Sequence, residues 1–431
     1  MRAKNQSRRR DWRFIVLGTL TLVAVVFIGA WIHGNTSPPI VIPPKIAPVP
    51  NAFDTFKSAA AMSTSSTPKS GSFESLTEAD IASYQQTIDN NKGALDMLRS
   101  GFQDEYLDTS LRSPATMYPY FAGFRNLARV LAMESAVKER SGDLEGSVNS
   151  ALDAVQLGEM CPRGATIIGE LVGVACQAIG RRPVWKSLAN LDGPQCKRLA
   201  ARYEKIMAMH VPITDSLTEE KYLGEQTLML LFRSTGAVQQ MANPSPGGSG
   251  GGMSATLLSN LYFMVHSKTK VLHLFQGYMD QVIDSSRKPY DQAKVPVPVP
   301  NDQFVQIMSP SFDQVILKDF ANSRTQNGIL LVAIALQGYH ADHKRYPDTL
   351  QQLVPEYLPA LPADPFATNG SFRYHLDAGD QYTMYSIGPD GIDDGGRVID
   401  NPSKSTKTSP YARYQIEKDS KGDIVAGKNI Y

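Results

Sequence analysis

Residues 328–396 of this 431-residue chain decide the fold of its C-terminal part, and they read GILLVAIALQGYHADHKRYPDTLQQLVPEYLPALPADPFATNGSFRYHLDAGDQYTMYSIGPDGIDDGG. An apolar helix runs into Tyr339, and Pro347 then ends the helical direction because proline restricts the residue before it to extended angles. A Pro-rich stretch ending at Asp364-Pro365-Phe366 follows, and an Asp/Gly-rich loop closes the segment. A helix that is apolar on much of its circumference must be covered, and a small antiparallel sheet is the natural cover.

The spacing of apolar and turn residues predicts the elements of this region. One long helix is expected over 311–339. Two strands with alternating side chains are expected at 371–376 and 381–387, joined by the turn Asp377-Ala378-Gly379-Asp380. A second hairpin is expected between 411–417 and 423–426.

The combination of these motifs resembles one known family. The apolar helix, the YP-x-T-L-x-x-L segment from Tyr346, the Asp364-Pro365-Phe366 turn, the two strands and the Asp/Gly loop come in the order found in the C-terminal domain of the major pseudopilin (the G subunit) of type II secretion systems. The resemblance covers residues of about 315–400. It implies a pseudopilin-like α+β domain over 311–431, with a long helix packed on a small antiparallel sheet.

The Asp/Gly loop at 386–396 is the candidate ion site. Hard cations such as calcium prefer carboxylate and carbonyl oxygens, and glycine lets a short loop turn several of them inward. Major pseudopilins bind structural calcium in this loop, so the resemblance implies Asp390, Asp393 and Asp394 as calcium ligands. The alternative is a solvated turn in which the aspartates bond only nearby amides.

The N-terminus predicts a membrane anchor. Six basic residues within 1–13 precede an apolar run from Phe14 to Ile32, which is long enough to cross a bilayer as a helix. The basic flank is expected in the cytoplasm, which predicts a single-pass protein of the inner or cytoplasmic membrane with most of the chain outside the cytoplasm. A cleaved signal peptide is the competing interpretation. A pilin-type leader is disfavoured, because no acidic residue follows Gly18 within the run.

The middle of the chain predicts an all-α domain. Thr77 and Asp80 match a capping box at a helix start, and Ser141-Gly142-Asp143 separates two amphipathic helices in the manner of a TPR-like hairpin. The predicted fold class is therefore α+β multidomain, and its parts are an anchor and basic tail (1–33), a Pro/Ser-rich linker (34–75), a helical domain (76–290), a Pro-rich linker (291–310) and the pseudopilin-like domain (311–431).

No catalytic constellation emerges from the residues, so the chain is not predicted to be an enzyme. His340 and His343 lack the glutamate of a zinc-protease motif, and nothing pairs Glu159 with Glu170. The Gly-rich run at 243–252 lacks the lysine of a phosphate loop.

The net charge and the cysteines narrow the possible partners. The net charge of +1 gives no positive field for binding nucleic acid. The three cysteines, Cys161, Cys176 and Cys196, permit one disulfide or serve as small buried hydrophobes.

Three functions are compatible with these features. The first is a membrane-anchored cell-envelope protein with an interaction or structural role in or near a secretion or pilus-like system, whose partners are the membrane and proteins of that system. The second is a true pseudopilin subunit with a large helical insertion. The third is an extracytoplasmic enzyme whose site lies in the helical domain, which requires a polar pocket with perturbed acids.

Overall fold

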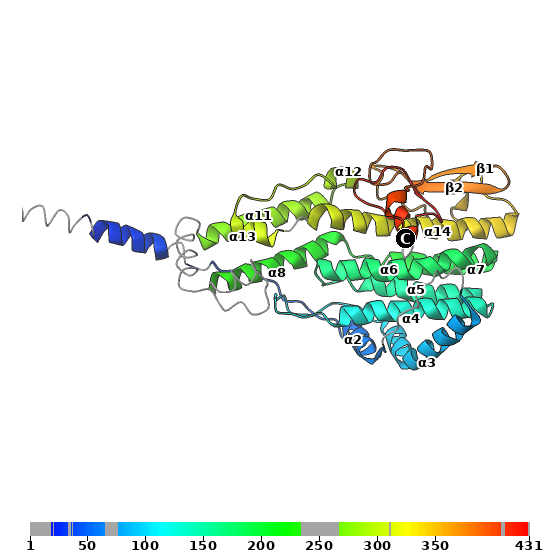
Figure 1. The fold of residues 1–431 in the computed structure, drawn as a ribbon, viewed down its shortest axis with the longest axis horizontal. Helices are drawn as coiled ribbons and strands as arrows, with labels where there is room; N and C mark the ends of the chain where they lie inside the picture. Colours follow the sequence, from blue (N-terminus) through cyan, green and yellow to red (C-terminus); the bar gives the residue numbers. More distant parts are fainter. Residues whose placement is uncertain are drawn as a thin grey trace, which may run out of the picture.

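A computed structural model of the chain describes residues 19, 21–32, 36, 38–64, 76–233, 267–309, 312–406 and 410–429. These residues form a mostly helical, elongated molecule with one small sheet near its C-terminus (Figure 1). The longer helices are α2 (Ala52–Met62), α3 (Glu78–Gly101), α4 (Tyr120–Arg140), α5 (Leu144–Met160), α6 (Ile167–Ser187), α7 (Gly193–Met207), α8 (Ile213–Arg233), α11 (Lys268–Ser286) and α14 (Phe312–His343). Two short helices, α12 (Tyr290–Ala293) and α13 (Gln303–Met308), lead into α14.

The helical region is built from antiparallel pairs, as the turn signals predict. Thr77 caps α3 in a full capping box with Asp80. Gly142 takes a positive φ of 86° between α4 and α5, a conformation that glycine adopts without strain. Asp143 then caps α5 by accepting a hydrogen bond from the Gly146 amide. Local residues therefore fix where these helices begin and end.

Helices α5 and α6 pack with their backbones in close contact. A Cβ added to Gly173 would lie 2.5 Å from the carbonyl oxygen of Gly158, and one added to Gly158 would lie 2.6 Å from that of Gly173. Farther along, Gly180 of α6 meets the carbonyl of Ala151 in the same way. Only glycine fits at these positions, because the obstructing atoms belong to backbone.

The C-terminal region contains a three-stranded antiparallel sheet in the order β1-β2-β3. Strand β1 (Arg373–Asp377) pairs with β2 (Gln381–Ser386), which matches the predicted hairpin. The predicted second hairpin is wrong. Residues Pro410–Tyr414 form a 3-10 helix instead, and β3 (Ile424–Val425) pairs with β2. Strand β3 pairs with the edge of β2 that β1 leaves free. The side chain of Asn429 then accepts a hydrogen bond from the Val425 amide.

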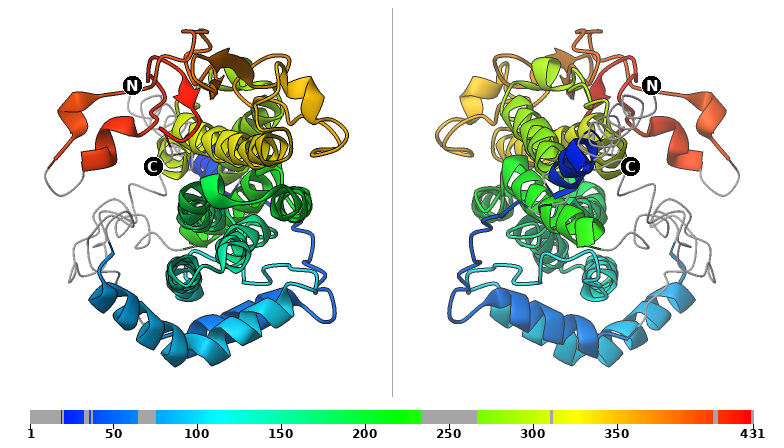
Figure 2. Two further views of the ribbon diagram at one scale, coloured as in Figure 1. Left: turned by 90° about the vertical axis from the view of Figure 1, so that its right-hand side faces the viewer. Right: turned by 90° about the vertical axis from the view of Figure 1, so that its left-hand side faces the viewer.

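Helix α14 lies between the sheet and the helical region (Figures 1 and 2). One hydrophobic cluster includes Leu152 of α5, Tyr203 of α7, Leu336 of α14 and Met384 of β2, all almost fully buried. The cluster thus joins the predicted helical domain and the predicted pseudopilin-like domain through a continuous core. The apolar circumference of α14 is covered by both neighbours.

The predicted transmembrane helix is contradicted. Of the apolar run Phe14–Ile32, residues 14–18 and 20 lie outside the described residues, as does the basic segment 1–13, and residues 21–32 form a helix. Among the described residues, no helix has the length and apolarity needed to cross a membrane. About 20 apolar residues in a row are required for that. The predicted α+β multidomain class with a transmembrane helix is therefore corrected to a mostly helical fold with one small three-stranded antiparallel sheet. The predicted single-pass location at the inner or cytoplasmic membrane is contradicted by the same finding.

The segment predicted as a Pro/Ser-rich linker contains ordered structure. Residues 52–62 form α2, whose Phe53 and Phe56 are buried against the bundle. The stretch before it is held by Lys45, whose Nζ donates to the carbonyls of Gly164 (2.7 Å) and Ser110 (3.2 Å). The Pro-rich stretch therefore lies against the helical region.

Candidate functional site

The three predicted calcium ligands lie in the loop after β2, each with its own partners. Asp390 accepts from the Ile392 amide (3.2 Å). Asp393 accepts from the Gly395 amide, the Tyr385 hydroxyl (2.9 Å) and Arg373 (3.2 Å). Asp394 accepts from Arg397 (2.7 Å). These contacts are those of a hydrogen-bonded turn, the alternative to an ion site.

Two further aspartates, which the sequence did not mark as ligands, hold this loop in place. Asp423 is fully buried and accepts from the amides of Gly396 (2.7 Å) and Asp394 (3.4 Å). Asp364, also buried, accepts from the Ser386 hydroxyl (2.7 Å) and the Phe366 amide (3.0 Å). Burial raises the pKa of both carboxyls, and the hydrogen bonds they accept oppose that rise. The Asp364-Pro365-Phe366 motif thus anchors the start of the loop.

Calcium binding at this loop stays a prediction. Within the described ranges, no three His, Cys, Asp or Glu side chains converge as a metal site. A calcium ion at Asp393 and Asp394 would compete with the positive charges of Arg373 and Arg397, which contact the same carboxylates. The carboxylates and glycines needed for such a site are nevertheless close together in the loop.

We expect calcium to raise the melting temperature of the full chain if the loop binds it, because a ligand that binds only the folded state stabilises it. The full chain is required, since α14 shares its core with α5 and α7. A double variant, Asp393→Asn with Asp394→Asn, should lose the shift, whereas Asp419→Asn, on an exposed turn, should keep it. Identical melts with calcium and with chelator would rule out the site.

A second polar cluster, buried between α5, α6, α7 and α14, is centred on Asn327. The Asn327 Oδ1 accepts from Arg181 (2.8 Å) and from the Tyr203 hydroxyl (2.9 Å). Its Nδ2 donates to Glu159 (2.8 Å) and Gln177 (3.1 Å). All five side chains are less than a tenth exposed. Since buried polar groups are costly without partners, this cluster fixes how α14 docks on the bundle.

Glu159 also lies near Glu170, although no pattern in the sequence pairs these two acids. Burial raises the pKa of Glu170 to about 8, and the negative charge of Glu159 adds to that effect. Ser216, which donates to Glu170 (3.3 Å), and the positive charge of Arg324 oppose it. His210 lies 3.5 Å from Glu159. The structure therefore brings together Glu159 and Glu170, which lie on different helices.

The raised pKa of Glu170 predicts a pH-dependent stability. The folded chain keeps the proton up to about pH 8, whereas the unfolded chain, with a pKa of 4.5, releases it earlier. The contribution of Glu170 is therefore fully present below pH 4.5 and is lost as the pH rises through about 8. Glu170→Gln imitates the protonated acid, so the variant should gain up to a few kcal/mol over the natural chain at pH 8 and almost nothing at pH 5.

Urea unfolding at pH 5 and pH 8 measures this difference, with Glu105→Gln at an exposed position as the control. A difference that is the same at both pH values would show that Glu170 is ionised in the folded chain.

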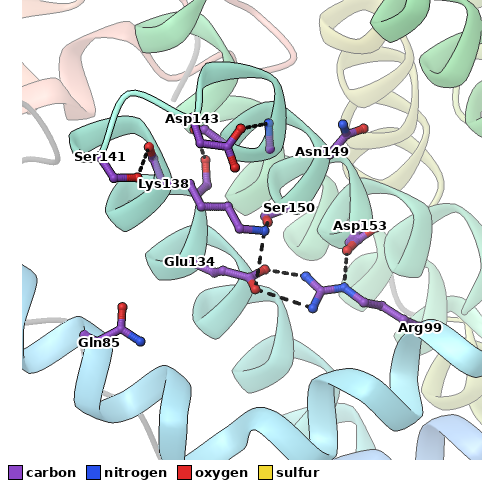
Figure 3. A network of polar contacts seen from close by, with 12 residues as sticks. Gln85, Arg99, Glu134, Lys138, Ser141, Asp143, Asn149, Ser150 and Asp153 are labelled. Atoms are coloured by element: carbon purple, nitrogen blue, oxygen red, sulfur yellow. Dashed lines mark hydrogen bonds and ion pairs between the residues drawn. The ribbon is translucent and has the colours of Figure 1, made fainter.

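A third network joins α3, α4 and α5 (Figure 3). Arg99 of α3 bridges Glu134 of α4 and Asp153 of α5, donating to Asp153 at 2.7 Å. Arg202 of α7 reaches the other oxygen of Asp153 (2.5 Å). Lys138 donates to Ser150 (2.8 Å). These partly buried contacts link α3, α4, α5 and α7.

The remaining candidate residues from the sequence are bonded, packed or buried within the fold, except for those outside the described residues. His340 pairs with Asp380 (2.8 Å), and His343 packs edge-on against Tyr339. All three cysteines are buried free thiols, and burial raises the pKa of each. The Gly-rich run at 243–252 lies outside the described residues.

Comparison of the chain with protein-family models, with curated proteins and with solved structures finds no match. The resemblance of residues 315–400 to the pseudopilin family stays a prediction.

Proposed function

We propose that this chain is a protein-binding or structural component in or near a secretion or pilus-like system, and that it carries out no catalysis. The surroundings of α14 are the observation that carries the proposal. The sequence order around α14 resembles that of a pseudopilin, yet α14 packs against α6 and α7 on one side and the sheet on the other. A helix covered on both sides within its own chain is not free to assemble into a filament.

The polar contacts of α14 strengthen this point. Ser323 and Asn327 bond Arg181 and Gln177 of α6, and Gln326 donates to the carbonyl of Asn429 near the C-terminus. Exposing this face would leave several buried polar groups without partners, at a cost of about 1–3 kcal/mol each. The bundle therefore acts as a permanent partner of α14, which supports a role other than that of a polymerising subunit.

The absence of catalysis is proposed from the state of the buried carboxylates. Glu159 and Glu170 are the acids that an enzyme hypothesis would use, and both are less than a twentieth exposed. Glu159 is bonded to Asn327, and Glu170 to Ser216. Their contacts join α5 to α14 and α6 to α8, which is a structural use.

The direct test is photo-crosslinking of the full chain in the organism that makes it, with a photoreactive residue at several exposed positions. We expect crosslinks to proteins of a secretion or pilus-like system, together with reduced secretion when the gene is deleted. An unchanged set of secreted proteins and no crosslinked partner would overturn the proposal.

The pseudopilin alternative has its own test. The mass of the mature chain is measured in cells with and without the prepilin peptidase. The proposal expects the same mass in both, because the apolar run lacks the acidic residue of a pilin leader. A larger chain in cells without the peptidase would restore the alternative.

A further inference from the structure

The surface between α4 and α6 carries two arginines that have no acidic partner among the described residues. Arg125 is exposed and Arg129 is half-buried, and neither side chain makes a hydrogen bond or ion pair within the described part of the chain. Other arginines of the bundle hold carboxylates, namely Arg99, Arg198 and Arg202. Arg125 and Arg129 are one helical turn apart on α4, so their positive charges lie on one face.

The neighbouring face of α6 exposes large apolar side chains. Ile168 is 51% exposed and Leu171 is 41% exposed, and their spacing of three residues places them on one side of the helix. The two faces adjoin, because Phe121 of α4 lies 3.3 Å from the position of a Cβ on Gly169 of α6. The charges of Arg125 and Arg129 also reach Cys176 of α6, where they oppose the burial that raises its pKa to about 12.

We propose that this α4/α6 surface, defined by Arg125, Arg129, Ile168 and Leu171, binds an acidic segment of a partner protein that also carries apolar side chains. The inference rests on the proposed protein-binding role and names the chemistry of the partner. Guanidinium groups bind carboxylates through paired hydrogen bonds, which sets the charge of the segment. Burying Ile168 and Leu171 is favourable against apolar side chains, so the segment must carry these as well.

The charge of the surface favours a short acidic peptide over nucleic acid. Nucleic-acid affinity comes from many phosphate contacts along a basic stripe, whereas two arginines supply few. The chain as a whole has a net charge of +1, so it provides no broad positive field. An acidic segment with leucines would instead use both halves of the surface.

The test uses the full chain and a fluorescein-labelled twelve-residue peptide of glutamates with two leucines, measured by fluorescence anisotropy. We expect saturable binding that weakens at least about tenfold in Arg125→Glu with Arg129→Glu, because each carboxylate contact becomes repulsive. The double variant Arg125→Gln with Arg129→Gln should weaken binding less. It replaces the charge-reversed variant in the test if charge reversal impairs folding. Arg345→Glu, at an exposed position outside the surface, should leave binding unchanged.

One peptide control and one protein variant test the apolar half of the surface. Replacing the leucines by alanines should weaken binding to the natural chain, and so should Leu171→Ala in the protein. Equal binding by the natural chain and both double variants would overturn the proposal. So would a single-stranded oligonucleotide that binds more tightly than the peptide, since the surface would then recognise phosphate.

Crosslinking in cells separates this inference from the proposed function. Loss of the partner crosslinks in the Arg125→Glu, Arg129→Glu chain supports the surface. Crosslinks that persist in this variant overturn the surface and leave the protein-binding role standing. If neither chain crosslinks any partner, both are overturned.

Discussion

Asn327→Ala is expected to destabilise the chain by about 3–5 kcal/mol, since breaking a buried charged network leaves uncompensated polar groups. The change removes one of the two acceptors of Arg181, the acceptor of Tyr203 and a donor to Glu159. Arg181 and Glu159 are almost fully buried, so bulk water does not readily replace these bonds. Urea unfolding monitored by circular dichroism measures the loss.

The matched control is Asn90→Ala, at an exposed position in the middle of α3. A surface substitution of this kind should change stability by less than about 0.5 kcal/mol. If the two variants unfolded at the same urea concentration, the network would contribute nothing to the docking of α14.

Gly173→Ala is the second change with a large expected effect. The added Cβ would lie 2.5 Å from the carbonyl oxygen of Gly158 and 2.9 Å from Pro162 Cγ. The carbonyl of Gly158 belongs to the backbone of α5 and cannot rotate away as a side chain can. The two helices, α5 and α6, must therefore move apart where they touch. We expect a loss of about 3 kcal/mol or more, at the upper end of overpacking effects. Thermal unfolding of the purified chain measures it.

Gly277→Ala is the control for this prediction. Gly277 lies within α11, and an added Cβ there meets nothing within 4 Å. Alanine is the better helix former, so this variant should gain about 0.5–1 kcal/mol. If Gly173→Ala were as stable as Gly277→Ala, the close approach of α5 and α6 would be wrong.

The parts of the fold that depend on neighbouring residues could be predicted from the sequence. The Thr77–Asp80 cap, the Gly142 turn and the β1–β2 hairpin all rest on residues within a few positions of each other. Helix α14 was expected from its apolar run. Helix α2 was missed, because its Ala-rich segment lies among Pro- and Ser-rich stretches that suggest a linker.

The candidate sites could be predicted only in part, because their contacts join distant residues. The Asp/Gly loop was visible as a cluster in the sequence, but Asp423, which bonds its amides, comes almost thirty residues later. Asn327 meets partners that lie more than a hundred residues before it. No short-range pattern marks such pairs. The proximity of Glu159 and Glu170 likewise follows from the antiparallel packing of α5 and α6.

The central claim is that α14 belongs to one core with the helical bundle, and native-state hydrogen exchange of the full chain tests it most directly. Amides of α14 in 328–336 and of α7 in 199–206 should exchange through one cooperative opening, with the same free energy in low concentrations of denaturant. If α14 and the sheet opened at a lower free energy while α5–α7 stayed protected, α14 would be a separate unit, and the account would be contradicted.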